Sequence, residues 1–272
     1  MSSAPGDTGF LGSIPAIYES HMVPLIFEPY ATDLAARLRA RSPASVLEIA
    51  AGTGVATRAL ANALPAGAEI IATDLNPAML QEAQRRGTSR PVSWQAADAM
   101  QLPLSDASVD AVVCQFGVMF LPDKAKGFAE TRRVLKPGGV FLFNVWDRID
   151  DNEIADVVTQ ALATVFPHDP PLFMARIPHG YHDLDVIHRD LAAGGFSATP
   201  RIESIDHRSR AASARAAAIT YCHGTPLRNE IEARDAAKLA EATDVCAAAL
   251  AARFGSGVVD AKIRAHVVMV VR

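Results

Sequence analysis

The strongest constraint on the fold is an alternation of strand-like and helix-like segments over residues 46–146. Short apolar runs rich in β-branched residues alternate with segments whose apolar residues recur at helical spacing. Strands are predicted at 46–49, 69–73, 92–96, 109–116 and 140–146, with helices at 55–63, 77–86 and 124–135. Strands that alternate with helices form βαβ units, so the sequence predicts a doubly wound, mostly parallel sheet rather than an all-α bundle.

The second half of the chain is predicted to complete this sheet and to add helices. Further strands are expected at 201–207 and 263–271, and helices at 152–166, at 183–193 and in pieces over the Ala-rich tract 209–252. Pro24 and Pro29 predict a break between two N-terminal helices. We expect one α/β domain over 1–272, with its core at 43–208 and 263–272, a helical cover at 1–42 and a helical lid at 209–262.

Composition narrows the classes of partner. The chain has 30 acidic residues against 26 Lys and Arg, a net charge of -4, so it lacks the basic excess typical of nucleic-acid binders. No signal peptide is predicted, nor is an apolar run of about 18 residues that would span a membrane. The three cysteines have no zinc-site spacing and indicate a reducing, cytoplasmic location. The oligomeric state stays open, and a homo-oligomer is compatible with the sequence.

Glycines mark the first predicted strand-to-helix turn. Gly52 and Gly54 follow the strand at 46–49 and permit close approach of a ligand to the backbone. The helix that begins after them offers unpaired N–H groups to an anionic group. A tight turn between strand and helix also needs glycine for structural reasons alone, so this motif is not decisive by itself.

Two acids follow the next two predicted strands. Asp74 ends the strand at 69–73, where a carboxylate can accept both hydroxyls of a ribose. The alternative is that Asp74 only caps the helix at Pro77. Asp98 follows the third strand and can accept a hydrogen bond from the exocyclic amine of adenine, with a neighbouring backbone N–H on a ring nitrogen. A solvated loop acid is the alternative for Asp98.

Together these motifs resemble the class I S-adenosylmethionine-dependent methyltransferases, in particular the type 11 group that includes ubiquinone and menaquinone biosynthesis enzymes. VLEIAAGTG is similar to the first motif of the family, and IATDLNPAMLQEA is similar to the second. WQAADAMQLPLSDASVDAVVCQFGVMFLPD and ETRRVLKPGGVFLFNVWD resemble the stretches around the fourth and fifth strands. The resemblance covers about residues 44–147 and implies a Rossmann-like sheet of seven strands in the order 3-2-1-4-5-7-6.

The resemblance also implies S-adenosylmethionine as cofactor. The implied cofactor-binding residues are Tyr18, Glu48, Ala50, Gly52, Gly54, Asp74, Leu75, Met79, Asp98, Ala99, Met100 and Gln115. Ala50 departs from the family pattern, which has glycine at this position. Thr57 stands where the dinucleotide pattern GxGxxG would need its last glycine, which argues against a nicotinamide cofactor.

Methyl transfer from a sulfonium needs alignment and exclusion of water more than acid–base groups, and no catalytic residue is predicted. The expected partner is a small-molecule methyl acceptor, enclosed by the lid, with Phe116, Tyr181 and His182 as predicted contacts. A metal site at His179, His182 and His188 is not predicted. The two rival functions are a nucleotide-dependent oxidoreductase on a similar sheet and a non-catalytic module that binds S-adenosylmethionine.

Overall fold

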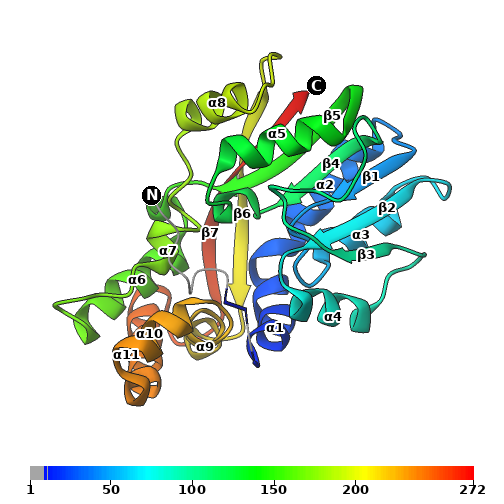
Figure 1. The fold of residues 1–272 in the computed structure, drawn as a ribbon. Coiled ribbons are helices and arrows are strands. Elements are labelled where there is room, and N and C mark those ends of the chain that lie inside the picture. The colour runs from blue at the N-terminus through cyan, green and yellow to red at the C-terminus, as the bar shows by residue number, and fades with distance from the viewer. Residues whose placement is uncertain (1–8, 11) are drawn as a thin grey trace. The chain divides into compact units, whose positions relative to one another are not determined.

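A computed structural model describes residues 9, 10 and 12–272, and its strands form one sheet in the order β3-β2-β1-β4-β5-β7-β6 (Figure 1). The strands are β1 (Ser45–Glu48), β2 (Glu69–Asp74), β3 (Ser93–Ala96), β4 (Val109–Gln115), β5 (Leu135–Trp146), β6 (Arg201–Ala211) and β7 (Val259–Val271). The pairs β1/β2, β1/β4, β2/β3 and β4/β5 are parallel. The predicted order and the mostly parallel sheet are confirmed.

β7 runs in the opposite direction to its neighbours. The amide of Arg272 donates to the oxygen of Gly139, whereas the amide of Asp147 donates to that of Arg264. All three last strands are longer than predicted. β5 already begins at Leu135 because Gly138, with φ +77°, and an irregular register beside Val109 let the KPGG segment pair with β4.

Most helices occupy the predicted segments, α3 and α4 with the predicted bounds, whereas η2, η3 and α7 lie outside the segments predicted to be helical. In the first half they are α1 (Ile14–Ile17), η1 (Tyr18–Phe27), α2 (Glu28–Arg39), α3 (Val55–Ala63), α4 (Pro77–Arg86), η2 (Val118–Phe120) and α5 (Lys124–Val134). In the second half they are η3 (Ile149–Asp151), α6 (Glu153–Val165), α7 (Phe173–Arg176), α8 (Leu184–Ala193), α9 (Ala214–His223), α10 (Leu227–Asp235), η4 (Ala236–Lys238) and α11 (Leu239–Phe254).

The predicted break between two N-terminal helices is wrong. α1, η1 and α2 follow one another without a loop, and η1 is a π-helix that contains Pro24. The wider π turn accommodates a residue that lacks an N–H, so the proline changes the helix type rather than ending the helix. Of the expected cover at 1–42, residues 1–8 and 11 lie outside the described residues.

Contacts divide the chain into two compact units. One unit holds 28–145, 181–205 and 265–272, and contains the glycine turn and both predicted acids. The other holds 146–180, 206–264 and the described part of 1–27. Among the described residues, no helix is both long and apolar enough to cross a membrane.

The first unit buries both faces of its sheet, because successive side chains of a strand point to opposite faces. Val140 and Leu142 of β5 pack in the cluster formed with α2 and α3. Phe141 and Phe143, at the alternate positions, contact the ring of Phe128 on α5 at 5.7 and 5.6 Å. The helices packed on the two faces of the sheet hold the ends of the strands at fixed positions.

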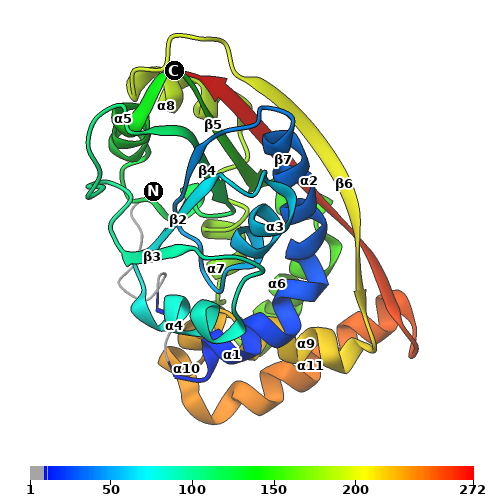
Figure 2. The ribbon, with the colours of Figure 1, turned by 90° about the vertical axis from the view of Figure 1, so that its right-hand side faces the viewer.

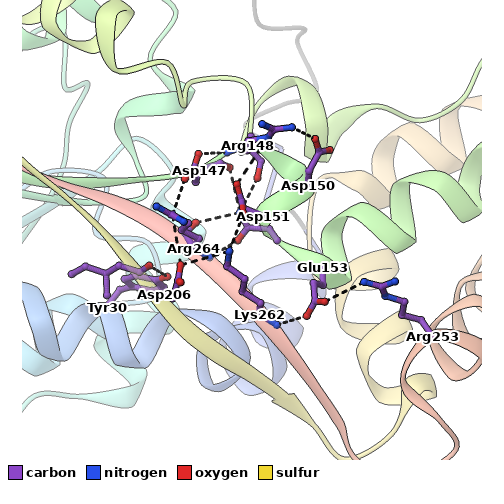
Figure 3. Close-up of polar contacts among 12 residues, drawn as sticks. Tyr30, Asp147, Arg148, Asp150, Asp151, Glu153, Asp206, Arg253, Lys262 and Arg264 are labelled. Atoms are coloured by element: carbon purple, nitrogen blue, oxygen red, sulfur yellow. Dashed lines mark hydrogen bonds and ion pairs between the residues drawn. The ribbon is translucent and has the colours of Figure 1, made fainter.

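In the second unit, α9, α10 and α11 lie side by side (Figures 1 and 2), and α11 also packs on α6. A charged network joins η3 and the start of α6 to β7 (Figure 3). Lys262 pairs with Asp151 at 2.9 Å, and Arg264 pairs with Asp147 at 3.1 Å. Acidic and basic side chains alternate in this network, so it anchors β7 to the segment that follows β5.

Candidate functional site

The loop after β1 is held in left-handed backbone conformations. Gly52 and Gly54 have φ +56° and +84°, and Ala50 has φ +53°, a value that costs energy for a residue with a side chain. Gly54 precedes α3 and has no side chain to cap it. A Cβ on Gly54 would lie 3.1 Å from that of Ala83 and 3.2 Å from the ring of Trp94. The loop therefore approaches α4 and β3 closely, and the first turn of α3 has no side-chain cap.

Asp74 holds this loop in place. Its Oδ2 accepts from the amide of Gly52 at 2.8 Å, and its Oδ1 accepts from the amide of Asn76 at 2.7 Å. Burial raises the pKa of Asp74, and these two amides lower it. Asn76, not Asp74, caps α4, because the Asn76 side chain accepts from the amide of Ala78 at 2.9 Å. The interpretation of Asp74 as only a helix cap is thus excluded.

Glu48, at the end of β1, is 1% exposed, and its Oε2 has no hydrogen-bond partner among the described residues. Burial raises its pKa to about 8; Thr57 and Arg58 on α3 oppose this shift, and Asp74 adds to it. A buried carboxyl group with an unused oxygen is suited to a cationic ligand, which would replace the lost hydration.

The pH dependence of the free energy of unfolding should reveal the raised pKa of Glu48. The unfolded chain releases the proton of Glu48 near its ordinary pKa, whereas the folded chain holds it to about pH 8. Between these values the folded state binds more protons, so the free energy of unfolding should fall as pH rises, by up to about 1.4 kcal/mol per pH unit. Denaturant unfolding between pH 5.5 and 8 should show this fall for wild type and a flatter profile for Glu48→Gln. Parallel profiles would refute the shift.

The end of β4 faces the same loop. A Cβ built on Gly117 would lie 2.4 Å from that of Ala50, so these two strand ends touch. Phe116 has φ +51°, and its amide donates to Asn144 Oδ1 at 2.9 Å. Its ring stands edge-on to that of Tyr30, 5.2 Å away between centroids. Ligands of open α/β sheets bind where the strand order reverses, and β1 and β4 meet at that point.

The loop after β3 completes the row of strand ends. The amide of Ala97 donates to the backbone oxygen of Asp74 at 3.0 Å, which joins this loop to β2. Asp98 Oδ1 accepts from the amide of Met100 at 2.8 Å. The Asp98 carboxylate is thereby fixed in a turn and is partly accessible.

Residues 47–143 match a family model described as a methyltransferase domain. This part of the chain therefore carries a methyltransferase domain. The demethylmenaquinone methyltransferase of Lactiplantibacillus plantarum is 42% identical over 107 residues, which cover 38% of this chain and 45% of the relative. The match thus spans about half the length of this relative.

Two solved structures share the methyltransferase fold. Phosphoethanolamine N-methyltransferase 2 of Haemonchus contortus has a TM-score of 0.60 at 18% identity, over 98% of this chain and 59% of that one. The [4+2]-cyclase SpnF has a TM-score of 0.55 at 17% identity, over 89% of this chain and 80% of that one. At sequence identities this low, the comparison shows only that the folds are similar. A shared fold does not by itself determine the reaction.

The methyltransferase fold brings most of the predicted site residues to neighbouring strand ends of one unit. Leu75 is 61% exposed beside Asp74, and Met79 Cε would lie 3.6 Å from a Cβ on Gly52. Ala99 and Met100 lie in the Asp98 turn, and Gln115 ends β4. Tyr18 belongs to the other unit, where its ring lies 5.3 Å from that of Phe27.

The predicted acceptor contacts at 181 and 182 have structural partners of their own. Tyr181 is buried, its hydroxyl donates to Asp190 at 3.0 Å, and the Nζ of Lys124 lies 5.1 Å from its ring centroid. His182 is half-buried and precedes Asp183, which caps α8. Within the described residues, no group of three or more His, Cys, Asp or Glu side chains could hold a metal ion.

Sequence reasoning missed two residues that shape this site. Asn144 positions Phe116, and Gly117 allows β4 to touch the β1 loop. Asn144 had a visible signal, because it is the one polar side chain in the apolar segment VFLFNVW. A polar residue in a strand buried on both faces needs a hydrogen-bond partner, which points to a backbone amide at a neighbouring strand end.

Asp98→Asn should change recognition of the adenine amino group. The substitution keeps the size of the side chain but replaces a pure acceptor by an amide that presents donors as well. We expect weaker binding of S-adenosylmethionine, by about 1–3 kcal/mol, and a smaller loss for an analogue that lacks the exocyclic amine. Competition calorimetry measures both affinities. Equal losses for the two ligands would show that Asp98 does not face the amine.

Proposed function

We propose that the protein transfers a methyl group from S-adenosylmethionine to a small-molecule acceptor by in-line displacement. The observation that carries the proposal is the junction of Glu48, the glycine loop and Asp74. It joins a buried carboxyl group with an unused oxygen, an uncapped helix start and a carboxylate that fixes the loop. This arrangement lies within the segment that matches the methyltransferase domain.

The residues fit the parts of the cofactor. The Glu48 carboxylate would pair with the amino group of the methionine end, and the N–H groups at the start of α3 would bind its carboxylate. Asp74 would accept the ribose hydroxyls through the remaining lone pairs of its oxygens. Asp98 and the adjacent amide of Ala99 would bind the adenine edge, beside Met100. Tyr18, Ala50, Gly54, Leu75, Met79 and Gln115 complete the proposed set.

When bound, the cofactor supplies an activated methyl group. The chain then has to orient the acceptor in line with that group and exclude water, which supplies much of the rate enhancement. Phe116 is well suited to such positioning, because Asn144 and Tyr30 hold its backbone and its ring. The proposal assigns no general base, since an acceptor that is already nucleophilic needs none.

The acceptor side of the proposal rests on the helices between β6 and β7. We propose that they form a lid over the acceptor, with Phe116, Tyr181 and His182 contributing contacts. The chain's acidic balance favours a small molecule over a nucleic acid. The proposed location is the cytoplasm, and the proposal allows a homo-oligomer.

Shortening the lid should separate binding from transfer. The observed strands end at Ala211 and begin at Val259, so 212–258 is the segment to replace by a four-residue turn. We expect the variant to bind S-adenosylmethionine, whose proposed ligands are all outside this segment, and to lose transfer. Calorimetry and product release measure the two properties. Transfer to the native acceptor by the shortened protein would show that the helices are a stabilising addition.

The function itself is tested by cofactor choice and product. We expect S-adenosylmethionine, but not a nicotinamide dinucleotide, to raise the melting temperature by mass action. Incubation with fractionated small-molecule extracts, and with demethylmenaquinol as one defined acceptor, should yield S-adenosylhomocysteine and a methylated product. Stabilisation by the dinucleotide would favour the oxidoreductase. Binding of S-adenosylmethionine with no product from any acceptor would favour the non-catalytic module.

A further inference from the structure

A carboxylate and a guanidinium on α5 form a pair that the proposed function does not use. Glu130 and Arg133 belong to the segment ETRRVLKPGG. Arg133 donates from Nε to Glu130 Oε1 at 2.8 Å and from Nη2 to Glu130 Oε2 at 2.9 Å. The side chains of Arg133 and Glu130 are 29% and 21% exposed. Two parallel hydrogen bonds between a guanidinium and a carboxylate fix their relative orientation, so the pair acts as one unit.

This pair binds the loop between β3 and β4. Glu130 Oε2 accepts from the amide of Leu102 at 2.9 Å, and Arg133 Nη2 donates to the oxygen of Leu102 at 2.9 Å. Arg133 Nη1 donates to the oxygen of Leu104 and to Asp106 Oδ1, both at 2.7 Å. These hydrogen bonds hold the second half of the loop on α5.

The charges of the pair strengthen its contacts with the loop. The hydrogen bonds from Arg133 lower the pKa of Glu130, although partial burial opposes this shift. The amide of Leu102 therefore donates to an ionised carboxylate, and hydrogen bonds to ionised groups are stronger than those between neutral groups. The backbone adds one more bond, because the oxygen of Arg133 accepts from the amide of Ala107 at 2.9 Å.

The turn that carries Asp98 directly precedes Leu102. Within the turn, the amide of Gln101 donates to the backbone oxygen of Asp98 at 2.9 Å. At its other end, the amide of Ala97 donates to the oxygen of Asp74 at 3.0 Å. The turn is therefore held on β2 at one end and on α5 at the other. A loop without helix or strand is among the more mobile parts of a fold, so these two anchors decide where the Asp98 carboxylate lies.

We propose that Glu130 and Arg133 are positioning residues for the adenine end of S-adenosylmethionine. They fix the residue after the turn, so Asp98 and the amide of Ala99 keep the spacing that the edge of the base requires. Hydrogen bonds weaken steeply with misalignment, so a loosened loop would recognise the amine poorly. This inference rests on the proposed function, because it requires the adenine to lie against Asp98. Both positioning residues act through the loop and touch no part of the ligand.

Binding of two ligands to the full chain tests the proposal. The probes are S-adenosylhomocysteine and S-inosylhomocysteine, in which an oxygen replaces the exocyclic amine. The wild type should prefer the first, because the Asp98 carboxylate accepts from an amine and repels an oxygen. Arg133→Gln should weaken binding of S-adenosylhomocysteine by about tenfold and of S-inosylhomocysteine by about twofold, so the preference falls by about fivefold. Calorimetry measures both affinities at a temperature where the variant is folded.

Two controls separate positioning from a general effect of the substitution. Arg85→Gln removes a guanidinium that binds Glu82 with the same spacing on α4, at 2.8 and 2.6 Å, and should leave the preference unchanged. In the Asp98→Asn background, Arg133→Gln should change the preference by less than about twofold, because the group that it positions is already altered. A merely structural role would lower the stability but would not change the preference between the two ligands.

Two further measurements cover the case in which Arg133→Gln fails to fold. Glu130→Gln keeps an oxygen for the amide of Leu102 but loses the charge, so a smaller fall in preference is expected. In the wild type without ligand, the Leu102 amide should exchange slowly with deuterium. Exchange at the rate of an unstructured peptide would show that the pair does not hold the loop.

The binding results distinguish failure of this inference from failure of the proposed function. Equal losses for both ligands, or an unchanged preference in both variants, would overturn the positioning role alone. A wild type that binds both ligands equally would refute the place of Asp98 and the inference with it. A wild type that does not bind S-adenosylhomocysteine would refute the proposed function itself, and the positioning role would fall with it.

Discussion

Replacing Asp74 by alanine is expected to weaken binding of S-adenosylmethionine by about 10- to 150-fold, or about 1.5–3 kcal/mol. The change removes the proposed acceptor of the ribose hydroxyls. It also releases the amide of Gly52, which Asp74 Oδ2 binds at 2.8 Å, so the loop loses its anchor. Folding should survive, because β2 keeps its backbone pairing with β1 and β3 on both sides.

The chain offers a matched control for this change. Asp110 also accepts two backbone amides, those of Ala44 and Ser45, both at 2.9 Å, but at the end where β1 begins. Asp110→Ala should therefore lower stability without a specific loss of cofactor affinity. Calorimetry on both variants at a temperature where both are folded separates the effects. Equal affinities for wild type and Asp74→Ala would refute the role of Asp74, as would equal losses in both variants.

The parts of the fold that were predictable from the sequence depend on local patterns. Each βα unit is short, its strand is apolar, and its turn carries glycine or a capping residue, as Asn76-Pro77 does for α4. Because the carboxyl ends of parallel strands meet at one edge, Asp74 and Asp98 could be assigned to one region before the structure was known. The contact of Asp74 with Gly52 follows from the same geometry.

The features that were not predictable depend on residues far apart in the chain. The residues around Pro24 do not indicate whether the proline ends the helix or is accommodated in a π-helix, as it is in η1. β6 and β7 extend past their apolar patterns, where ion pairs such as Arg208–Asp260 at 2.5 Å join exposed positions. Ion pairs between two strands do not produce a periodic pattern of apolar residues in the sequence of either strand. The division into two compact units is likewise a property of contacts rather than of composition.

The second large effect is expected at Gly117. A methyl group there would lie 2.4 Å from the Cβ of Ala50 and 2.7 Å from the sulfur of Cys114, and both separations are far inside van der Waals contact. Gly117→Ala must therefore displace the β1 loop or the end of β4. We expect a loss of stability of about 1–3 kcal/mol, as in other overpacked cores, together with a loss of cofactor binding.

A second substitution should restore part of what Gly117→Ala removes. Ala50→Gly deletes the nearer of the two clashing atoms and relieves a φ of +53°, so the double variant should bind the cofactor better than Gly117→Ala alone. Gly67→Ala is the neutral control, because a Cβ there meets nothing within 4 Å. A double-mutant cycle on melting temperature and cofactor affinity measures the coupling, expected at about 0.5–3 kcal/mol for residues in contact. Zero coupling would mean that the Cys114 contact, and not Ala50, limits the size of residue 117. The alanine that departs from the family's glycine would then be unrelated to the glycine at the end of β4.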